Sequence, residues 1–428
     1  MFIFKEINSL FKNLEKKRKK FSKKFNNFTS NNKSIVKQGL LALIICAIGD
    51  LIAGIILGNM TFFLETFPGL LVIIPGAIGM RGNIFGSFSS RLNTNLHIGT
   101  LSPELKKSDI LIQNIVSAII LVLLLSIILP IIAKIICIIF SFESMSTVDF
   151  ILISAFSGII SCFIMLPISM FFSLKSYEHG WDPDNITTPL VTASGDLFTL
   201  PSIILSIFLV IFINNDFLKI IILAILVFIT LASFIYIIIL NGEAKKIILQ
   251  STPVLIFSSF LGIFSGGFLN NSSSTFLNNP TLLTLVPLFS GENGSLLSIL
   301  CARLSSALHS GLIEPVLRPE KHTLTNFIIL FIFGLFIYPF MALLVEFSLG
   351  ALGIETLGLL KTLLIVFISG FIVITIMMVI IFYLSALSFR EGLDPDNIVI
   401  PISTSLTDLV SMTTLTSIAV LILSSTMF

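Results

Sequence analysis

The chain carries one pair of motifs twice, and each residue of the second copy stands 212 positions after its counterpart in the first. The first motif comprises these matched residues: Pro75, Gly79, Gly82, Arg91, Leu92, His97 and Gly99, repeated as Pro287, Gly291, Gly294, Arg303, Leu304, His309 and Gly311. The second comprises another set: Gly180, Asp182, Pro183, Asp184, Asn185, Pro189, Thr192 and Asp196, repeated as Gly392, Asp394, Pro395, Asp396, Asn397, Pro401, Thr404 and Asp408. Because polar residues at one fixed offset do not recur by chance in apolar sequence, the chain is an internal duplication.

Composition places the duplicated unit in a membrane. Charged residues make up 11% of the chain, whereas soluble globular proteins carry roughly 25%. Eleven apolar runs are long enough to cross about 30 Å of hydrocarbon: 36–59, 66–90, 110–140, 148–174, 187–213, 217–240, 248–268, 280–305, 323–348, 359–387 and 399–427. We therefore predict an all-α polytopic membrane protein with about eleven transmembrane helices.

Five predicted spans belong to each copy, and the span at 217–240 has no counterpart. A single helix between two five-helix units restores the orientation of the second unit. The two repeats are therefore expected to be parallel and related by a pseudo-two-fold axis along the membrane normal. The expected domains are a tail at 1–35, a first transmembrane module at 36–213, a linking helix at 214–247 and a second module at 248–428.

The tail predicts the orientation of the protein. Eleven of the 25 Lys and Arg residues precede residue 38, and such a bias marks the cytosolic side. Apolar residues at helical spacing followed by a basic block favour an amphipathic helix on anionic inner-leaflet lipids. The alternative is a solvated tail that only sets topology, and nothing else in the chain supports nucleic-acid binding. With eleven spans, the N-terminus is expected to be cytosolic and the C-terminus extracytosolic.

Asp196 and Asp408 lie about ten residues inside the predicted fifth and eleventh spans, which places them roughly 15 Å deep, near the middle of the bilayer. A charge at that depth costs about 2.5–3.5 kcal/mol on insertion scales, and no Lys or Arg with a matching twin lies there in both copies. A cation from solution is the simplest compensation. Thr192 and Thr404, one turn earlier on the same helix face, offer further oxygen ligands. The alternative is that each aspartate bonds a neighbouring helix and only fixes the packing.

Four further acids begin the same two spans: Asp182, Asp184, Asp394 and Asp396. At the cytosolic mouth of a path they would attract cations, and divalent cations most strongly. The alternative is helix capping, for which Asp and Asn are favoured residue types.

The second and eighth spans each contain a glycine pair followed by a polar residue: Gly79, Gly82 and Asn83, then Gly291, Gly294 and Ser295. Such pairs permit either a close helix crossing or an unwound turn that lines a cavity, and the polar residues favour the second. Arg81 and Glu292 have no charged counterparts, which predicts a contact between them. Asp50 in the first span is another unmatched acid, expected either to bind a coupling ion or to bond a neighbouring helix. Together with Asn83 and Ser295, Asp50 and Glu292 form a candidate accessory or coupling site.

His97 and His309 end the second and eighth spans, and we expect a structural role for them because hard cations prefer oxygen ligands. The four cysteines lie in apolar stretches without metal-ligand spacing, and are expected to be small buried residues: Cys46, Cys137, Cys162 and Cys301.

At its repeated motifs the chain resembles the MgtE-type magnesium transporters, and more closely their eukaryotic relatives in solute carrier family 41, which also carry two fused transmembrane modules. The resemblance runs from about residue 36 to the C-terminus. It implies that Mg²⁺ binds in a central pore through the fifth-helix aspartates, here Asp196 and Asp408, and it matches a helix-one acid to Asp50. Bacterial MgtE proteins are dimers with a large cytosolic Mg²⁺-sensing region. Only about 35 residues precede the first span here, so control by that route is not expected.

We therefore expect a transporter or channel, not an enzyme, that moves hydrated Mg²⁺ between the two repeats of one monomer, with Mn²⁺ and Co²⁺ as other candidate ions and no organic cofactor. One alternative is Na⁺- or H⁺-coupled exchange through Asp50 or the aspartate pair. Another is an intramembrane aspartyl protease, which also uses two buried aspartates. Its Tyr-Asp and Gly-x-Gly-Asp signatures are missing, since the chain contains no Tyr-Asp and reads Ala193-Ser194-Gly195-Asp196.

Overall fold

The computed structural model describes residues 33–102, 108–179, 187–240, 242–309, 311–391 and 395–424, and all regular structure in these ranges is helical. The helices are α2 (Lys33–Gly58), α3 (Thr61–Thr66), α4 (Leu70–Ile98), α5 (Asp109–Ile139), α6 (Thr147–His179), α7 (Thr187–Phe212), α8 (Asp216–Ile239), α9 (Glu243–Asn271), α10 (Ser273–Leu277), α11 (Pro280–His309), α12 (Lys321–Ala351), α13 (Leu359–Arg390) and α14 (Pro395–Ser424). Eleven of them are long and apolar enough to cross a membrane, α3 and α10 being the exceptions. The predicted all-α fold with eleven spans is confirmed for the described chain.

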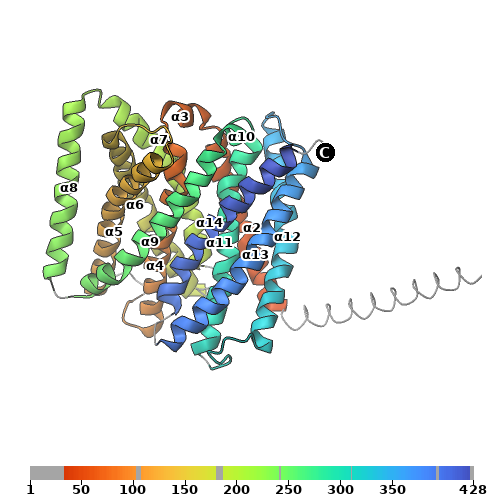
Figure 1. Ribbon diagram of the computed structural model, residues 1–428. Helices are drawn as coiled ribbons and strands as arrows, with labels where there is room; N and C mark the ends of the chain where they lie inside the picture. The colour runs from red at the N-terminus through yellow and green to blue at the C-terminus, as the bar shows by residue number, and fades with distance from the viewer. Residues whose placement is uncertain are drawn as a thin grey trace, which may run out of the picture.

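Helices α4 and α11 form the centre of the bundle. In each of them 83% of the most apolar stretch is buried, against 11% in α8, which stands at the edge of the molecule in Figure 1. Both central helices continue without a break through their glycine pairs. The unwound turn expected at these glycines is therefore wrong.

The first half of the molecule (α2–α7) and the second half (α9–α14) are packed against each other through equivalent helices. Helix α2 contacts α7 of its own half and α11 of the other, while α9 contacts α14 of its own half and α4 of the other. Each of these contacts has a counterpart at the 212-residue offset. The first spanning helix of each half therefore packs against both halves and forms part of the interface between them.

The short helices α3 and α10, which the sequence did not predict, precede α4 and α11 and lie at the same end of the bundle, at the top of Figure 1. The four cysteines are buried, as expected, and none of them is part of a disulfide.

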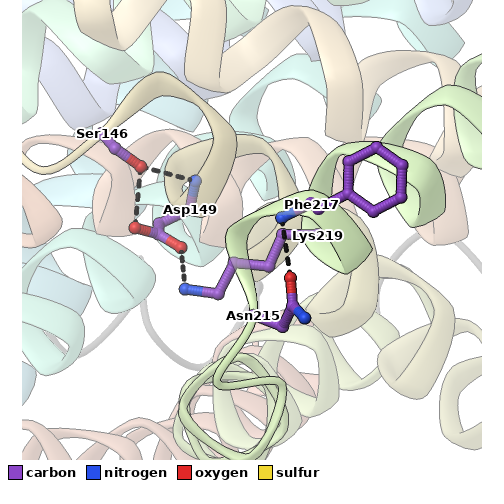
Figure 2. A network of polar contacts seen from close by, with 5 residues as sticks. All are labelled: Ser146, Asp149, Asn215, Phe217 and Lys219. Carbon is purple, nitrogen blue, oxygen red and sulfur yellow. Dashed lines mark hydrogen bonds and ion pairs between the residues drawn. The ribbon is translucent and has the colours of Figure 1, made fainter.

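Helix α8 joins the halves at the edge of the bundle, where it contacts α5, α6 and α9. Lys219 on α8 forms an ion pair with Asp149 on α6, with Nζ 2.7 Å from Oδ1. Asp149 also accepts a hydrogen bond from Ser146, and Asn215 caps α8 by accepting from the main-chain N–H of Phe217 (Figure 2). These polar contacts fix the start of α8 to the first half, while most of its length remains outside the core.

Candidate cation site

A cavity of about 490 Å³ lies between the two halves. Asp196 on α7 and Asp408 on α14 both line it, as do Thr192 and Thr404, one turn before each aspartate. Other lining residues come from α4, α11 and the first part of α9. The matched acids of the two sequence copies therefore meet at one internal space.

Each aspartate faces a glycine of the opposite half. A Cβ placed on Gly79 of α4 would lie 3.1 Å from Oδ2 of Asp408, and one placed on Gly291 of α11 would lie 2.7 Å from Oδ2 of Asp196. The two glycines correspond at the repeat offset. A side chain at either position would displace the carboxylate, so the glycines hold space for acids brought by the other module.

Additional oxygen and amide groups surround Asp408. Ser290 on α11 donates to Oδ1 of Asp408 at 2.6 Å. Asn83 on α4 accepts from the Thr404 hydroxyl at 3.0 Å and donates to Ser405 Oγ at 3.2 Å, which ties the first half to α14. Asn83 and Ser295 also line the cavity.

From the aspartates the cavity runs away from α3 and α10. Its lining on α9 is confined to 247–255, close to the start of that helix, whereas the other end of α9 leads to α10. The lining residues Ser90 and Gln250 are exposed, so the cavity reaches the protein surface there. We call this the open end, and the end that carries α3 and α10 the sealed end.

Two more acids lie behind Asp196, outside the cavity lining. Asp50 on α2 and Glu292 on α11 are fully buried, and none of their carboxylate oxygens has a hydrogen-bond partner among the described residues. Asp50 approaches the same face of Gly291 as Asp196 does, because a Cβ placed on Gly291 would overlap the carboxyl groups of both residues.

The predicted contact between Arg81 and Glu292 is wrong. Arg81 donates from Nη2 to Ser157 Oγ on α6 at 2.7 Å, and its Nε and Nη1 have no partner within the described chain. The repeat counterpart of Arg81 is Asn293, not Glu292. Because one residue turns a helix by about 100°, Arg81 and Glu292 belong to different helix faces. Asn293 instead accepts from the Tyr338 hydroxyl at 2.7 Å.

Comparison with known proteins identifies the family. The sequence model of MgtE, a divalent cation transporter, matches residues 74–207 and again 286–418, together more than half of the chain. The chain belongs to the MgtE family. The two matches begin in α4 and α11 and end in α7 and α14, so each half supplies one MgtE unit.

Curated relatives of this MgtE protein belong to solute carrier family 41. Member 3 from Rattus norvegicus is 22% identical over 401 residues, covering 87% of this chain and 84% of the relative. Member 2 from Homo sapiens is 24% identical over 399 residues, covering 87% and 68%. No solved structure matches the chain. The expected resemblance is confirmed, and the protein is a multi-pass divalent cation transporter of the membrane.

The chemistry of this MgtE site suits an ion that keeps water. No three His, Cys, Asp or Glu side chains converge as a metal-binding group in the part of the chain that the structure describes. Two carboxylates with hydroxyl and amide neighbours would give an ion too few protein ligands to replace a whole hydration shell. Mg²⁺ retains several waters in such sites.

Several predicted residues of the MgtE protein lie outside the described chain or its described side chains. Asp182, Asp184 and Asp394 fall in undescribed segments, as does nearly all of the tail at 1–35. Asp396 lies in α14, and His97 and His309 end α4 and α11, but their side chains are not described. The mouth acids and the tail helix stay predictions.

Sequence comparison missed Ser290 and Ser405. Their counterparts in the first half are Ile78 and Ala193, so a search for repeated polar residues passes over both. Their positions next to predicted site residues could have indicated them, because Ser290 directly precedes Gly291 and Ser405 directly follows Thr404.

Proposed function

We propose that this protein moves hydrated Mg²⁺ through the cavity between its halves, with Asp196 and Asp408 as the acidic ligands. The observation that carries the proposal is that both aspartates, one from each MgtE unit, line one internal space that reaches the surface. Thr192, Thr404 and Asn83 supply neutral oxygens beside them. Because both acids belong to one chain, a monomer holds the whole site.

The site favours a hard divalent ion. Its described side-chain ligands are oxygen groups, which suit Mg²⁺ and Mn²⁺ better than soft metals. Two negative charges match one divalent ion, and contacts made through water tolerate a cavity wider than a bare ion. Family membership favours transport over proteolysis for the same pair of aspartates.

The decisive measurement is Mg²⁺ flux into proteoliposomes that contain purified protein. The double variant Asp196→Asn with Asp408→Asn should lose flux while keeping the melting temperature and elution profile of a folded protein. The matched control is Asp109→Asn with Asp216→Asn, two exposed acids in the first turns of α5 and α8, which should transport normally. Normal flux in the first double variant would contradict the proposal.

A second candidate is coupled exchange, favoured by the buried acids Asp50 and Glu292. They lie next to Asp196 without hydrogen-bond partners in the described chain. A monovalent cation or a proton bound there would neutralise part of the negative charge that remains when Mg²⁺ leaves. Flux driven by the Mg²⁺ gradient alone, in vesicles free of Na⁺ and clamped at one pH, would exclude obligatory coupling.

The proposed orientation places the N-terminus and the open end in the cytosol. This assignment follows from the distribution of Lys and Arg. A membrane-impermeant reagent that labels an added N-terminal tag only after the membranes of intact cells are permeabilised would support it, and labelling of sealed cells would reverse it.

A further inference from the structure

The cavity stops just beyond the aspartates. Its lining residues toward the sealed end include Pro75, Val286 and Met412, and all three are buried. Past them, α4 is covered by α9 and α11 is covered by α2. An ion that reaches the aspartates from the open end therefore has no path onward in this conformation.

Two close helix crossings lie in this blocked region. A Cβ placed on Gly54 of α2 would overlap the carbonyl oxygen of Thr284 and lie 2.9 Å from its carbonyl carbon. A Cβ placed on Gly266 of α9 would overlap the carbonyl oxygen of Val72 and lie 2.8 Å from its carbonyl carbon. Gly54 matches Gly266 and Val72 matches Thr284 at the repeat offset. The same backbone contact is therefore made twice, each time between the two halves.

Buried hydroxyl groups lie on the sealed side of the site. Thr284 Oγ1 and Ser411 Oγ are buried and have no hydrogen-bond partner in the described ranges. Ser411 is one turn past Asp408 on α14, toward the sealed end. Buried hydroxyls without partners are costly, and they would gain water as partners if this region opened.

We propose that the Gly54–Thr284 and Gly266–Val72 crossings together form the gate that closes the cation path at the sealed end. This inference rests on the proposed function, because it assumes an ion at Asp196 and Asp408. The gate opens when the halves separate at both crossings, and Thr284 and Ser411 then line the path. It closes when the backbones return to contact.

Glycine makes such a gate reversible. Where backbones meet without side chains between them, the helices pack closely through van der Waals contact, and no interlocked side chain must be withdrawn before they separate. Both crossings join the first spanning helix of one half (α2 or α9) to the second spanning helix of the other half (α11 or α4). One relative movement of the halves therefore changes both together.

The test measures access to Thr284 from each membrane face. In a background with the four native cysteines replaced by Ala, Thr284→Cys is placed in proteoliposomes and treated with a membrane-impermeant thiol reagent on one face at a time. The thiol should react from the face that carries α3 and α10, and faster while Mg²⁺ is being transported. Reaction only from the open end, or a rate unaffected by transport, would overturn the gate.

Adding a methyl group at a crossing should hold it open. Gly54→Ala or Gly266→Ala overpacks the closed state and should raise the labelling rate of Thr284→Cys roughly tenfold, equivalent to about 1.4 kcal/mol. The controls are Gly49→Ala on α2 and Gly267→Ala on α9, where the added methyl would meet its nearest neighbours at 3.9 Å and 3.7 Å. Labelling that rises equally in the controls, or does not rise in Gly54→Ala, contradicts the proposal.

The two proposals fail in different ways. If Asp196 and Asp408 do not bind the ion, the double Asp→Asn variant transports normally, whatever the labelling shows. If the crossings are only structural, that variant loses flux while labelling of Thr284→Cys stays the same in the glycine variants. Should the glycine variants fail to fold, the transport-dependent labelling of Thr284→Cys alone decides the question.

Discussion

The surroundings of Asp408 and Asp196 differ although the two residues occupy equivalent positions in the repeats. Asp408 accepts a hydrogen bond from Ser290, and its main-chain carbonyl accepts one from Ser265. Asp196 is 3% exposed and has the acids Asp50 and Glu292 behind it. A neutral donor thus orients the carboxylate of Asp408, while two further acidic side chains lie close to Asp196. The residues shared by the two copies determine where these aspartates lie, and the residues that differ between the copies determine the surroundings of each.

The same contrast extends to the helix contacts around them. Asn83 ties α4 to α14 through Thr404 and Ser405. In the other copy the counterpart of Asn83 is Ser295 and the counterpart of Ser405 is Ala193, which has no hydroxyl group. Asp50 also stands where the other half has Gly262, which lets α9 approach Gly76 of α4 closely. Both interfaces share the close glycine crossings, but only the α2–α11 interface contains carboxyl groups without hydrogen-bond partners in the described chain.

The largest expected effect comes from neutralising either aspartate alone. Asp196→Asn and Asp408→Asn should each lower Mg²⁺ flux at least thirtyfold, about 2 kcal/mol, because each removes one of the two negative charges that attract the divalent ion. Their stabilities should diverge. The new amide at position 196 can donate to Asp50, so Asp196→Asn should raise the free energy of unfolding by about 1–3 kcal/mol, whereas Asp408→Asn should not.

Thermal melting beside flux measurement checks this pair. Equal stability changes in the two variants would show that Asp50 and Glu292 do not destabilise Asp196. The proposed difference between the surroundings of Asp196 and Asp408 would then be wrong.

Removing the donor to Asp408 should have the next largest effect. Ser290→Ala deletes the hydroxyl bonded to Oδ1, and a hydrogen bond to a charged group contributes about 1.5–3 kcal/mol. The apparent affinity for Mg²⁺ should fall by roughly tenfold or more, measured from the concentration dependence of flux. Ser298→Ala is the comparison, because that hydroxyl donates to the carbonyl of Ser295 in its own helix, and its effect should be several times smaller.

A double-mutant cycle tests whether the buried acids act through Asp196. Asp50→Asn combined with Glu292→Gln should weaken the apparent Mg²⁺ affinity by about tenfold, near 1.4 kcal/mol, since nearby negative charge attracts the ion. The loss should shrink when Asp196→Asn is already present and persist beside Asp408→Asn. Equal coupling to both aspartates would mean that the acids serve the cavity as a whole.

The smallest effect is expected at the linking helix. Lys219→Met removes the ion pair with Asp149, and partly exposed pairs contribute about 0.2–1 kcal/mol. The melting temperature should fall slightly and the flux should not change. A large loss of flux would show that the attachment of α8 to the first half helps to maintain the difference between the two sites.

Much of this structure could be predicted from the sequence because the determining signals are local or repeated. Long apolar runs predict spans, and a shared offset between Asp196 and Asp408 predicts that they occupy equivalent positions. The contacts made by one copy alone had no such signal. Ser290 has Ile78 as its counterpart, and nothing in the sequence shows that it bonds Asp408. The expected Arg81–Glu292 contact failed because helix rotation separates neighbouring residues, and the expected unwinding failed because the glycines face a cavity without breaking hydrogen bonds.

Helix α8 has a consequence beyond its few contacts. Two identical subunits that associate around an axis must present the same residues on both sides, so any new acid appears in both copies of the site. A covalent linker removes that constraint, because each module can acquire its own substitutions while the ratio of the two modules stays one to one. The two copies differ in this way at Asp50, Arg81 and Glu292, whose counterparts are Gly262, Asn293 and Met80. The peripheral helix thus allows one site to specialise into two unlike sides, a freedom that a homodimer of single modules does not have.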